Sequence, residues 1–182
     1  MGIVLVRLIE EILGLKAEIS ENEVVLVLKE NKKLKKVLNL LKNHSEFQYK
    51  ELIDLYGVDY ISREKRFEVH YVLWSLQYND RIRIKCYLGL EESLESVSSV
   101  YSSANWLERE VWDMYGIYFM DHPDLRRILT DYGFEGFPLR KDFPVTGFLE
   151  MRYNENEKRI VYEPVELSQE YRLFHFLSPW EK

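Results

Sequence analysis

The sequence is short of the residues that carry most protein chemistry. Cys86 is its single cysteine among 182 residues. An intrachain disulfide is therefore excluded, and so is an iron–sulfur cluster held by the usual four thiolates of this chain. No apolar run approaches the roughly 20 residues that a membrane-spanning helix requires. We expect a chain that is soluble by itself, in a reducing compartment, and that reaches a membrane only through partners.

Patterns typical of enzymes and of targeting segments are also missing. There is no glycine-rich phosphate loop and no G-x-S-x-G turn of a serine hydrolase. The four histidines are His44, His70, His122 and His175, and none of them follows the spacing of metal ligands. The N-terminal apolar stretch contains an arginine and is followed by two glutamates, unlike a secretory signal. We expect no catalytic residue, no bound cofactor and no metal ligand in this chain.

The net negative charge of the chain makes some classes of binding partner improbable. The net charge is -6 and the pI is about 5.4. A nucleic-acid-binding surface needs a basic face that displaces counterions, so nucleic acid is not expected as a partner. Apolar residues make up 46% of the chain, which is enough for a sizeable core.

Hydrophobic periodicity predicts the fold class. The clearest strand covers residues 81–88, in which apolar residues alternate with arginine, lysine and tyrosine. Further strands are predicted over residues 16–20, 23–29, 52–60 and 67–76, and helices over residues 3–13 and 32–42. Asn79 and Asp80 suggest a tight hairpin. We predict an α+β domain over residues 1–118, with helices packed on a mostly antiparallel sheet.

A third helix is predicted over residues 104–115. Two serines just before it, of which Ser103 is the nearer, are candidates to cap its first free amides. Gly116 tolerates the left-handed conformation that ends many helices. Arg109 and Asp113 lie one turn apart and are expected to pair.

The segment from 119 to 147 alternates ionisable residues with large apolar ones. Its arginines and lysine roughly balance its carboxylates, so it is no basic patch. Arginine beside carboxylates and aromatic rings suits bidentate pairing in a partly desolvated contact. A solvated loop with incidental charge is the commoner alternative. We interpret residues 119–147, which we call the signature segment, as an interface.

Residues 148–182 show no strong periodicity and are predicted to form a long irregular extension. Seven aromatic residues are scattered through this charged tail: Phe148, Tyr153, Tyr162, Tyr171, Phe174, Phe176 and Trp180. Ordinary disorder predicts few aromatics. An extended strap laid across partner subunits fits better, and folding back on the chain's own sheet is the alternative.

Three ordered motifs resemble one known family. They are ERE-x-WDMYG (residues 108–116), HPDLRRIL (residues 122–129) and FPLRKDFP (residues 137–144). The family is a respiratory complex I subunit, known in mitochondria as NADH dehydrogenase subunit nine and in bacteria as the C subunit. The resemblance runs from about Gly57 to the C-terminus. Phe137 stands where the family commonly has histidine, so we assign no proton-handling role there.

The resemblance implies a non-catalytic structural subunit in the peripheral arm of proton-pumping NADH:ubiquinone oxidoreductase. Its partners would be the subunits that hold the terminal iron–sulfur cluster and form the quinone site. FMN, iron–sulfur clusters and ubiquinone would bind to neighbours, with no cofactor in this chain. The location would be the matrix side of the mitochondrial inner membrane, or the cytoplasmic side of a bacterial plasma membrane. The residues assigned to partner contact are Glu108, Arg109, Trp112, Asp113, His122, Arg126, Arg127, Arg140, Lys141, Asp142 and Trp180.

Two alternatives stay open at this point. One is the equivalent subunit of a chloroplast-type complex or of a membrane-bound hydrogenase. The other is a stand-alone enzyme that uses His122 and neighbouring carboxylates. For the leading interpretation, Arg140→Ala is expected to block assembly while the isolated domain stays folded, because an unpaired buried charge costs on the order of 3–5 kcal/mol.

Overall fold

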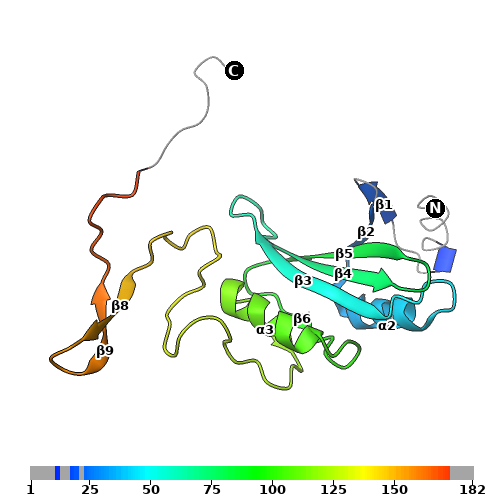
Figure 1. Ribbon diagram of the computed structural model, residues 1–182. Coiled ribbons are helices and arrows are strands. Elements are labelled where there is room, and N and C mark those ends of the chain that lie inside the picture. Colours follow the sequence, from blue (N-terminus) through cyan, green and yellow to red (C-terminus); the bar gives the residue numbers. More distant parts are fainter. Residues whose placement is uncertain (1–10, 13–16, 21–22, 173–182) are drawn as a thin grey trace, which may run out of the picture. The chain divides into compact units, whose positions relative to one another are not determined.

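The computed structural model describes residues 11–12, 17–20 and 23–172, and it divides the chain into two compact units between Phe143 and Pro144. The larger unit is built on a five-stranded sheet (Figure 1). The strands are β1 (Ala17–Ser20), β2 (Glu23–Leu28), β3 (Glu51–Asp59), β4 (Phe67–Ser75) and β5 (Asp80–Leu88), in the order β1-β2-β5-β4-β3. Among the described strand pairs of this sheet, β2 and β5 run parallel and the other pairs are antiparallel. The α+β class with a mostly antiparallel sheet is confirmed.

Strand β5 shows why this sheet forms where the sequence predicts it. Ile82, Ile84, Cys86 and Leu88 are all buried, while the residues between them are half-buried. This is the period of two that buries one face of a strand. Burial raises the pKa of the Cys86 thiol to about 12, so Cys86 behaves as a small apolar core residue.

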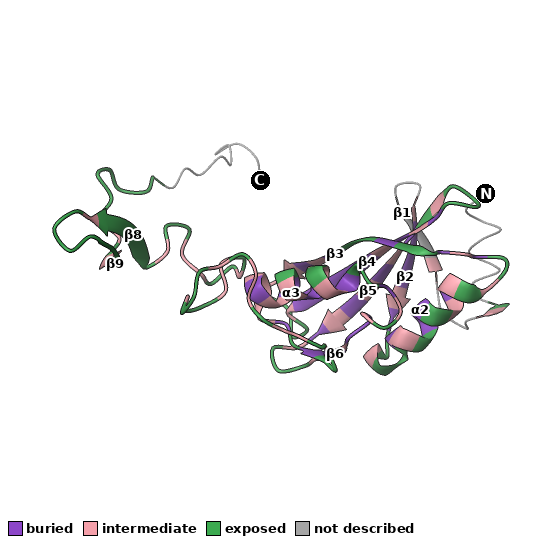
Figure 2. Cartoon of the chain, turned by 60° about the horizontal axis from the view of Figure 1, so that its bottom comes forward, coloured by how far each residue is buried: buried purple, intermediate pink, exposed green. Residues whose placement is uncertain are grey.

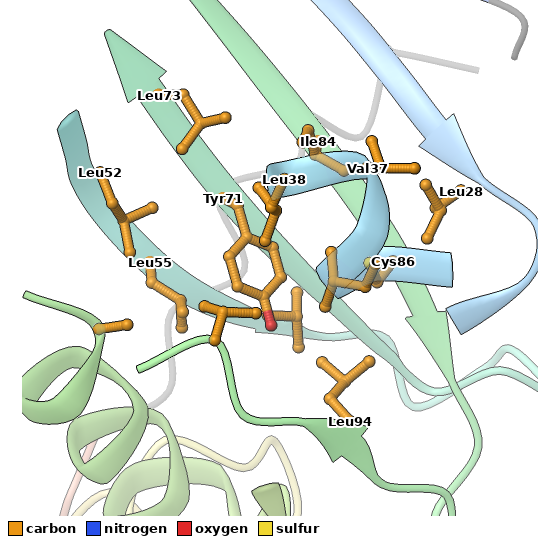
Figure 3. Packing of buried hydrophobic residues seen from close by; sticks show 14 of the residues in the cluster. Leu28, Val37, Leu38, Leu52, Leu55, Tyr71, Leu73, Ile84, Cys86 and Leu94 are labelled. Carbon is orange, nitrogen blue, oxygen red and sulfur yellow. The ribbon is translucent and has the colours of Figure 1, made fainter. Parts of the chain in front are cut away.

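Two helices cover one face of the sheet. A short 3₁₀ turn, η1 (Asn31–Lys33), leads into α2 (Leu34–Asn43), and α3 (Ala104–Tyr115) follows later in the chain. Figure 2 shows α2 and α3 on the same side of the sheet, with buried positions turned toward it. Leu38 of α2 and Tyr71 of β4 meet in the middle of this core (Figure 3). The helix predicted over residues 3–13 lies mostly outside the described residues.

The serine-rich residues 91–101 before α3 contribute a strand and several core side chains. Strand β6 (Leu94–Glu95) pairs in parallel with β7 (Phe119–Met120). Leu94, Val97 and Tyr101 are buried in the core, although the surrounding serines and glutamates conceal any period. This connection therefore closes the core and holds the start of the signature segment.

The smaller unit contains a β-hairpin that the sequence analysis missed. Strand β8 (Leu149–Asn154) pairs antiparallel with β9 (Arg159–Pro164), where an irregular extension was predicted. The alternation is present in both strands, but the charged residues and the proline obscured it. Phe174, Phe176 and Trp180 lie outside the described residues. Among the described helices, none is long and apolar enough to cross a bilayer.

Candidate partner-binding segment

Helix α3 is the support on which the signature segment is built. It ends as predicted, since Gly116 has φ 73° and its N–H bonds to the carbonyl of Trp112 at 2.8 Å. Its start differs from the prediction. Ser103 makes no capping bond, because its hydroxyl donates instead to the carbonyl of Leu52 on β3 at 3.1 Å. The serine thus ties the helix to the sheet.

Asp113 anchors the middle of the segment to α3. One carboxylate oxygen accepts the backbone N–H groups of Ile128, Leu129 and Thr130 at 3.0, 2.7 and 2.9 Å. The other accepts the Thr130 hydroxyl at 2.5 Å and the Arg127 guanidinium at 3.2 Å. Burial by itself would raise the pKa of Asp113, but the hydrogen bonds from Thr130, Leu129 and Ile128 outweigh it and hold the pKa below its ordinary value. A buried, ionised Asp113 therefore organises this turn.

The predicted pair between Arg109 and Asp113 is wrong. Because Asp113 is turned inward, the Arg109 guanidinium donates to the carbonyls of Arg126 and Arg127 at 3.0 and 3.4 Å. Arg109 also lies over the Trp106 ring, with its Cζ 5.2 Å from the ring centroid. Arg109 holds the same turn as Asp113 does, from the outer side of the helix.

The last motif caps the C-terminal end of α3. The N–H of Leu139 donates to the Met114 carbonyl at 3.1 Å, and Arg140 Nε donates to the Tyr115 carbonyl at 2.6 Å. A cation at this end is also stabilising, because the C-terminal end of a helix carries partial negative charge. The Phe137 ring lies against Gly116, where a Cβ atom would meet it at 2.6 Å. Phe137 thus has a packing role in this chain.

A buried carboxylate on the sheet fixes the rest of this motif. Asp59, at the end of β3, accepts two bonds from Arg66, at 2.6 and 2.7 Å. The Lys141 N–H donates to the same carboxylate at 2.7 Å, and Arg66 reaches Asp142 at 2.9 Å. The Arg66 guanidinium is the main cause that lowers the pKa of Asp59. The segment is therefore tied to both α3 and the sheet.

The Asp59 anchor predicts an acid-dependent loss of stability. A carboxyl whose folded pKa is depressed contributes stability that is present above its ordinary value of 3.8 and is lost as the pH falls through the folded value. Asp59→Asn should flatten the dependence of the unfolding free energy on pH, measured by urea titrations from about pH 6 to about pH 2. The control is Glu51→Gln, an exposed position on the same strand. An unchanged acid slope in Asp59→Asn would contradict this role.

Glu108 lies on the buried side of α3 and joins the signature segment to the β6 connection. Its carboxylate accepts the Ser96 hydroxyl and the Val97 N–H, both at 2.7 Å. His122 Nε2 lies 3.8 Å from it and 3.1 Å from the Asn105 carbonyl. Burial raises the pKa of Glu108 to about 7, against the lowering effect of the bonds from Ser96 and Val97.

Outside these anchors the segment presents large apolar side chains to solvent. Tyr132 is 99% exposed, Leu129 62% and Leu139 50%. Trp106 and Tyr118 are exposed beside it on and after α3. Single exposed apolar residues are ordinary, but here several lie on one braced segment. The segment is therefore a candidate surface for contact with another protein.

The structure separates the predicted contact residues into three groups. Glu108 and Asp113 are fully buried and bonded within this chain, so they support the segment and do not themselves lie at a surface. The His122 side chain is also fully buried, beside Glu108. Arg109, Trp112, Arg127 and Arg140 are half-buried, and Arg126, Lys141 and Asp142 are exposed. Trp180 lies outside the described residues. For the half-buried and exposed residues, contact with a partner stays a prediction.

Sequence reasoning missed Asp59 and Arg66 as parts of this site. Both fall in stretches that resemble the family, GVDY and RFEVHYVLWSL, yet they lie far in sequence from the motif that they hold. Within the described part of the chain, no group of three or more histidine, cysteine or acidic residues could hold a metal ion. Fold and segment together define a class: a two-layer α+β domain that carries an internally braced surface segment.

The comparisons with known proteins identify the family. Residues 27–149 match the family described as "Respiratory-chain NADH dehydrogenase, 30 Kd subunit". The chain belongs to this family, which confirms the resemblance found in its motifs. The C subunit of the NADH-quinone oxidoreductase of Paramagnetospirillum magneticum is 59% identical over 146 residues, covering 80% of this chain and 73% of that protein.

Relatives named as subunit 9 of NADH-ubiquinone oxidoreductase are similar as well. NADH-ubiquinone oxidoreductase subunit 9 of Prototheca wickerhamii is 58% identical over 149 residues, covering 82% of this chain and 78% of that protein. The subunit 9 of Reclinomonas americana is 48% identical over 181 residues, covering 100% of this chain and 88% of that protein. Among solved structures, a chain of the archaeal membrane-bound sulfane sulfur reductase shares the fold, with a TM-score of 0.65 and 20% identity over 78% of this chain and 84% of that chain.

Proposed function

We propose that this chain is a non-catalytic structural subunit of the peripheral arm of NADH:ubiquinone oxidoreductase, complex I. One observation carries the proposal: a segment within the matched family region is braced by buried carboxylates and yet presents Leu129, Tyr132 and Leu139 to solvent. The relatives that are 58% and 59% identical are named for NADH oxidation. This favours the NADH-linked complex over a hydrogenase-type one.

The bracing explains how such a subunit would hold its partners in register. Asp113 and Asp59 fix the backbone of the segment before any partner arrives. A preorganised surface loses less conformational entropy on binding than a loose loop does. Exposed aromatic and aliphatic anchors then supply the apolar contact, and the charges of Arg126 and Lys141 border it.

The expected partners are the peripheral-arm subunits that hold the terminal iron–sulfur cluster and form the quinone site. FMN, the clusters and ubiquinone would bind to those neighbours, and this chain would contribute no catalytic residue. The tail from residue 148 onward would lie across partner subunits. The complex would place this chain on the matrix side of the mitochondrial inner membrane, or on the cytoplasmic side of a bacterial membrane.

Purification in mild detergent through a tag on the N-terminus tests this function. We expect a large membrane assembly that contains a flavin subunit and reduces quinone with NADH. A partner-free monomer recovered from the native source would overturn the proposal. NADH-independent activity of the isolated chain would instead support the stand-alone enzyme.

Tyr132→Glu should prevent assembly without unfolding the domain. Tyr132 is almost fully exposed, so the substitution leaves the core intact, but it places a charge in the proposed apolar contact. We expect the level of assembled complex to fall by about tenfold or more, measured on native gels. Arg140→Ala does not separate assembly from folding, because Arg140 also caps α3 and its loss would destabilise the domain.

Ile61→Glu is the matched control for this variant. Ile61 is 62% exposed in the loop between β3 and β4, outside the signature segment. Its variant should assemble normally, and both isolated domains should melt like the wild type. Normal complex levels in Tyr132→Glu would count against the signature segment as the interface.

A further inference from the structure

The register of the β8–β9 hairpin sorts its side chains onto two different faces. The cross-strand partners Leu149 and Pro164, Met151 and Tyr162, and Tyr153 and Ile160 share one face. The other face carries the pairs Glu150 and Glu163, Arg152 and Val161, and Asn154 and Arg159. The hairpin therefore has one wholly apolar face and one mostly charged face.

The charged face is satisfied within the hairpin itself. Arg152 makes a two-pronged bond to Glu163, at 2.9 and 2.6 Å, and Arg159 pairs with Glu157 at 2.5 Å. Both pairs are largely exposed, and burying them under a partner would cost desolvation energy. The charged face thus marks the solvent side of the hairpin.

The apolar face is largely open to solvent. Its five large side chains, Leu149, Met151, Tyr153, Ile160 and Tyr162, are between 53% and 62% exposed. A two-stranded hairpin is marginally stable in water unless its apolar face packs on something. An apolar face of this size on a hairpin indicates a docking surface.

The charges around the hairpin indicate what covers it. Glu155 and Glu157 lie in its turn beside Lys158, and Glu166 and Glu170 follow β9 before Arg172. Residues 149–172 carry six carboxylates and four basic side chains, so their net charge is negative. Segments that dock on membranes are rich in lysine and arginine, because lipid surfaces are negatively charged. The net negative charge of this region disfavours an anionic lipid surface and suits a protein surface with basic side chains at its border.

We propose that the apolar face of the β8–β9 hairpin docks on an apolar patch, bordered by lysine or arginine, of another subunit in the same assembly. This inference rests on the proposed function, since it requires that the chain be part of a complex. It assigns to the hairpin a contact separate from that of the signature segment. On binding, the charged face would remain in solvent.

Photo-crosslinking in the purified complex tests the docking directly. A photoreactive residue replaces Met151 on the apolar face, and Val161 on the charged face serves as the matched control. Position 151 should crosslink to one other subunit, at a peptide with apolar and basic residues, while position 161 gives little product. Crosslinks from position 151 to lipid, to residues 17–143 of this chain or to a second copy would overturn the proposal.

Charge substitutions supply the second measurement. Met151→Glu should lower incorporation into the complex by about tenfold or more, whereas Val161→Glu, with the same new charge beside Arg152, should assemble normally. Equal incorporation of the two variants would overturn the hairpin contact and leave the subunit function intact. Failure of the wild-type chain to enter any complex would refute the proposed function itself.

Discussion

Asp113→Ala is expected to release the signature segment from α3. The substitution removes the acceptor for the N–H groups of Ile128, Leu129 and Thr130 and leaves Arg127 without its buried partner. Breaking such a pair from one side costs about 3–5 kcal/mol. Urea titrations should show a loss of this order in the unfolding free energy, and limited proteolysis should cut residues 127–142 much faster than in the wild type.

A conservative variant at Asp113 and a control variant at Glu110 separate this role from a general effect of mutating the helix. Asp113→Asn keeps one oxygen for the three N–H groups, so it should lose less stability than Asp113→Ala. Glu110→Ala, at an exposed position on the same helix, should leave stability and proteolysis unchanged. Wild-type stability and cleavage in Asp113→Ala would show that the segment is held by other contacts.

Glu108→Gln is expected to stabilise the protein above neutral pH. The pKa of Glu108 is raised from 4.5 to about 7, so the folded state holds its proton over a range in which the unfolded chain has lost it. Between these two values the stability of the wild type falls as the pH rises, by about 1.4 kcal/mol per pH unit and about 3 kcal/mol in all. Glutamine has no charge to bury, so its variant avoids this loss.

The measurement is the difference in unfolding free energy between variant and wild type at several pH values. The difference should be small near about pH 5 and should grow to about 3 kcal/mol in favour of Glu108→Gln by about pH 8. A glutamine can still accept the Val97 N–H and donate to the Ser96 hydroxyl. Glu110→Gln is the exposed control on the same helix. Parallel pH curves for Glu108→Gln and wild type would refute the assignment.

Asp113 and Glu108 lie on the same helix, but their pKa values are shifted in opposite directions. Asp113 meets three backbone N–H groups and a guanidinium, and they stabilise its charge. Glu108 meets one hydroxyl and one N–H in the core, which are too few to offset its burial. Protonation at low pH should therefore weaken the hydrogen bonds that the Asp113 carboxylate accepts. Ionisation of Glu108 at high pH should instead destabilise the fold, because it buries a charge.

Much of the larger unit could be predicted from the sequence because its signals are local. Alternation along β5, the apolar runs of β2 and β4 and the glycine after α3 depend on residues close together in the chain. The three motifs indicated the family for the same reason. The hairpin was missed because the alternating positions of its two strands carry so many charges.

The sequence by itself determined the five strands of the main sheet, helices α2 and α3, the α+β class and the family. Only the tertiary structure decided what each charged residue of the signature segment does. Arg109 and Asp113 are one turn apart, yet they do not pair. The buried Asp113 accepts the Thr130 N–H, and Arg109 donates to the carbonyl of Arg126. Asp59 reaches Lys141 across 82 positions of sequence. The partner of a charge depends on which groups the folded core leaves unsatisfied, and chain spacing does not encode that.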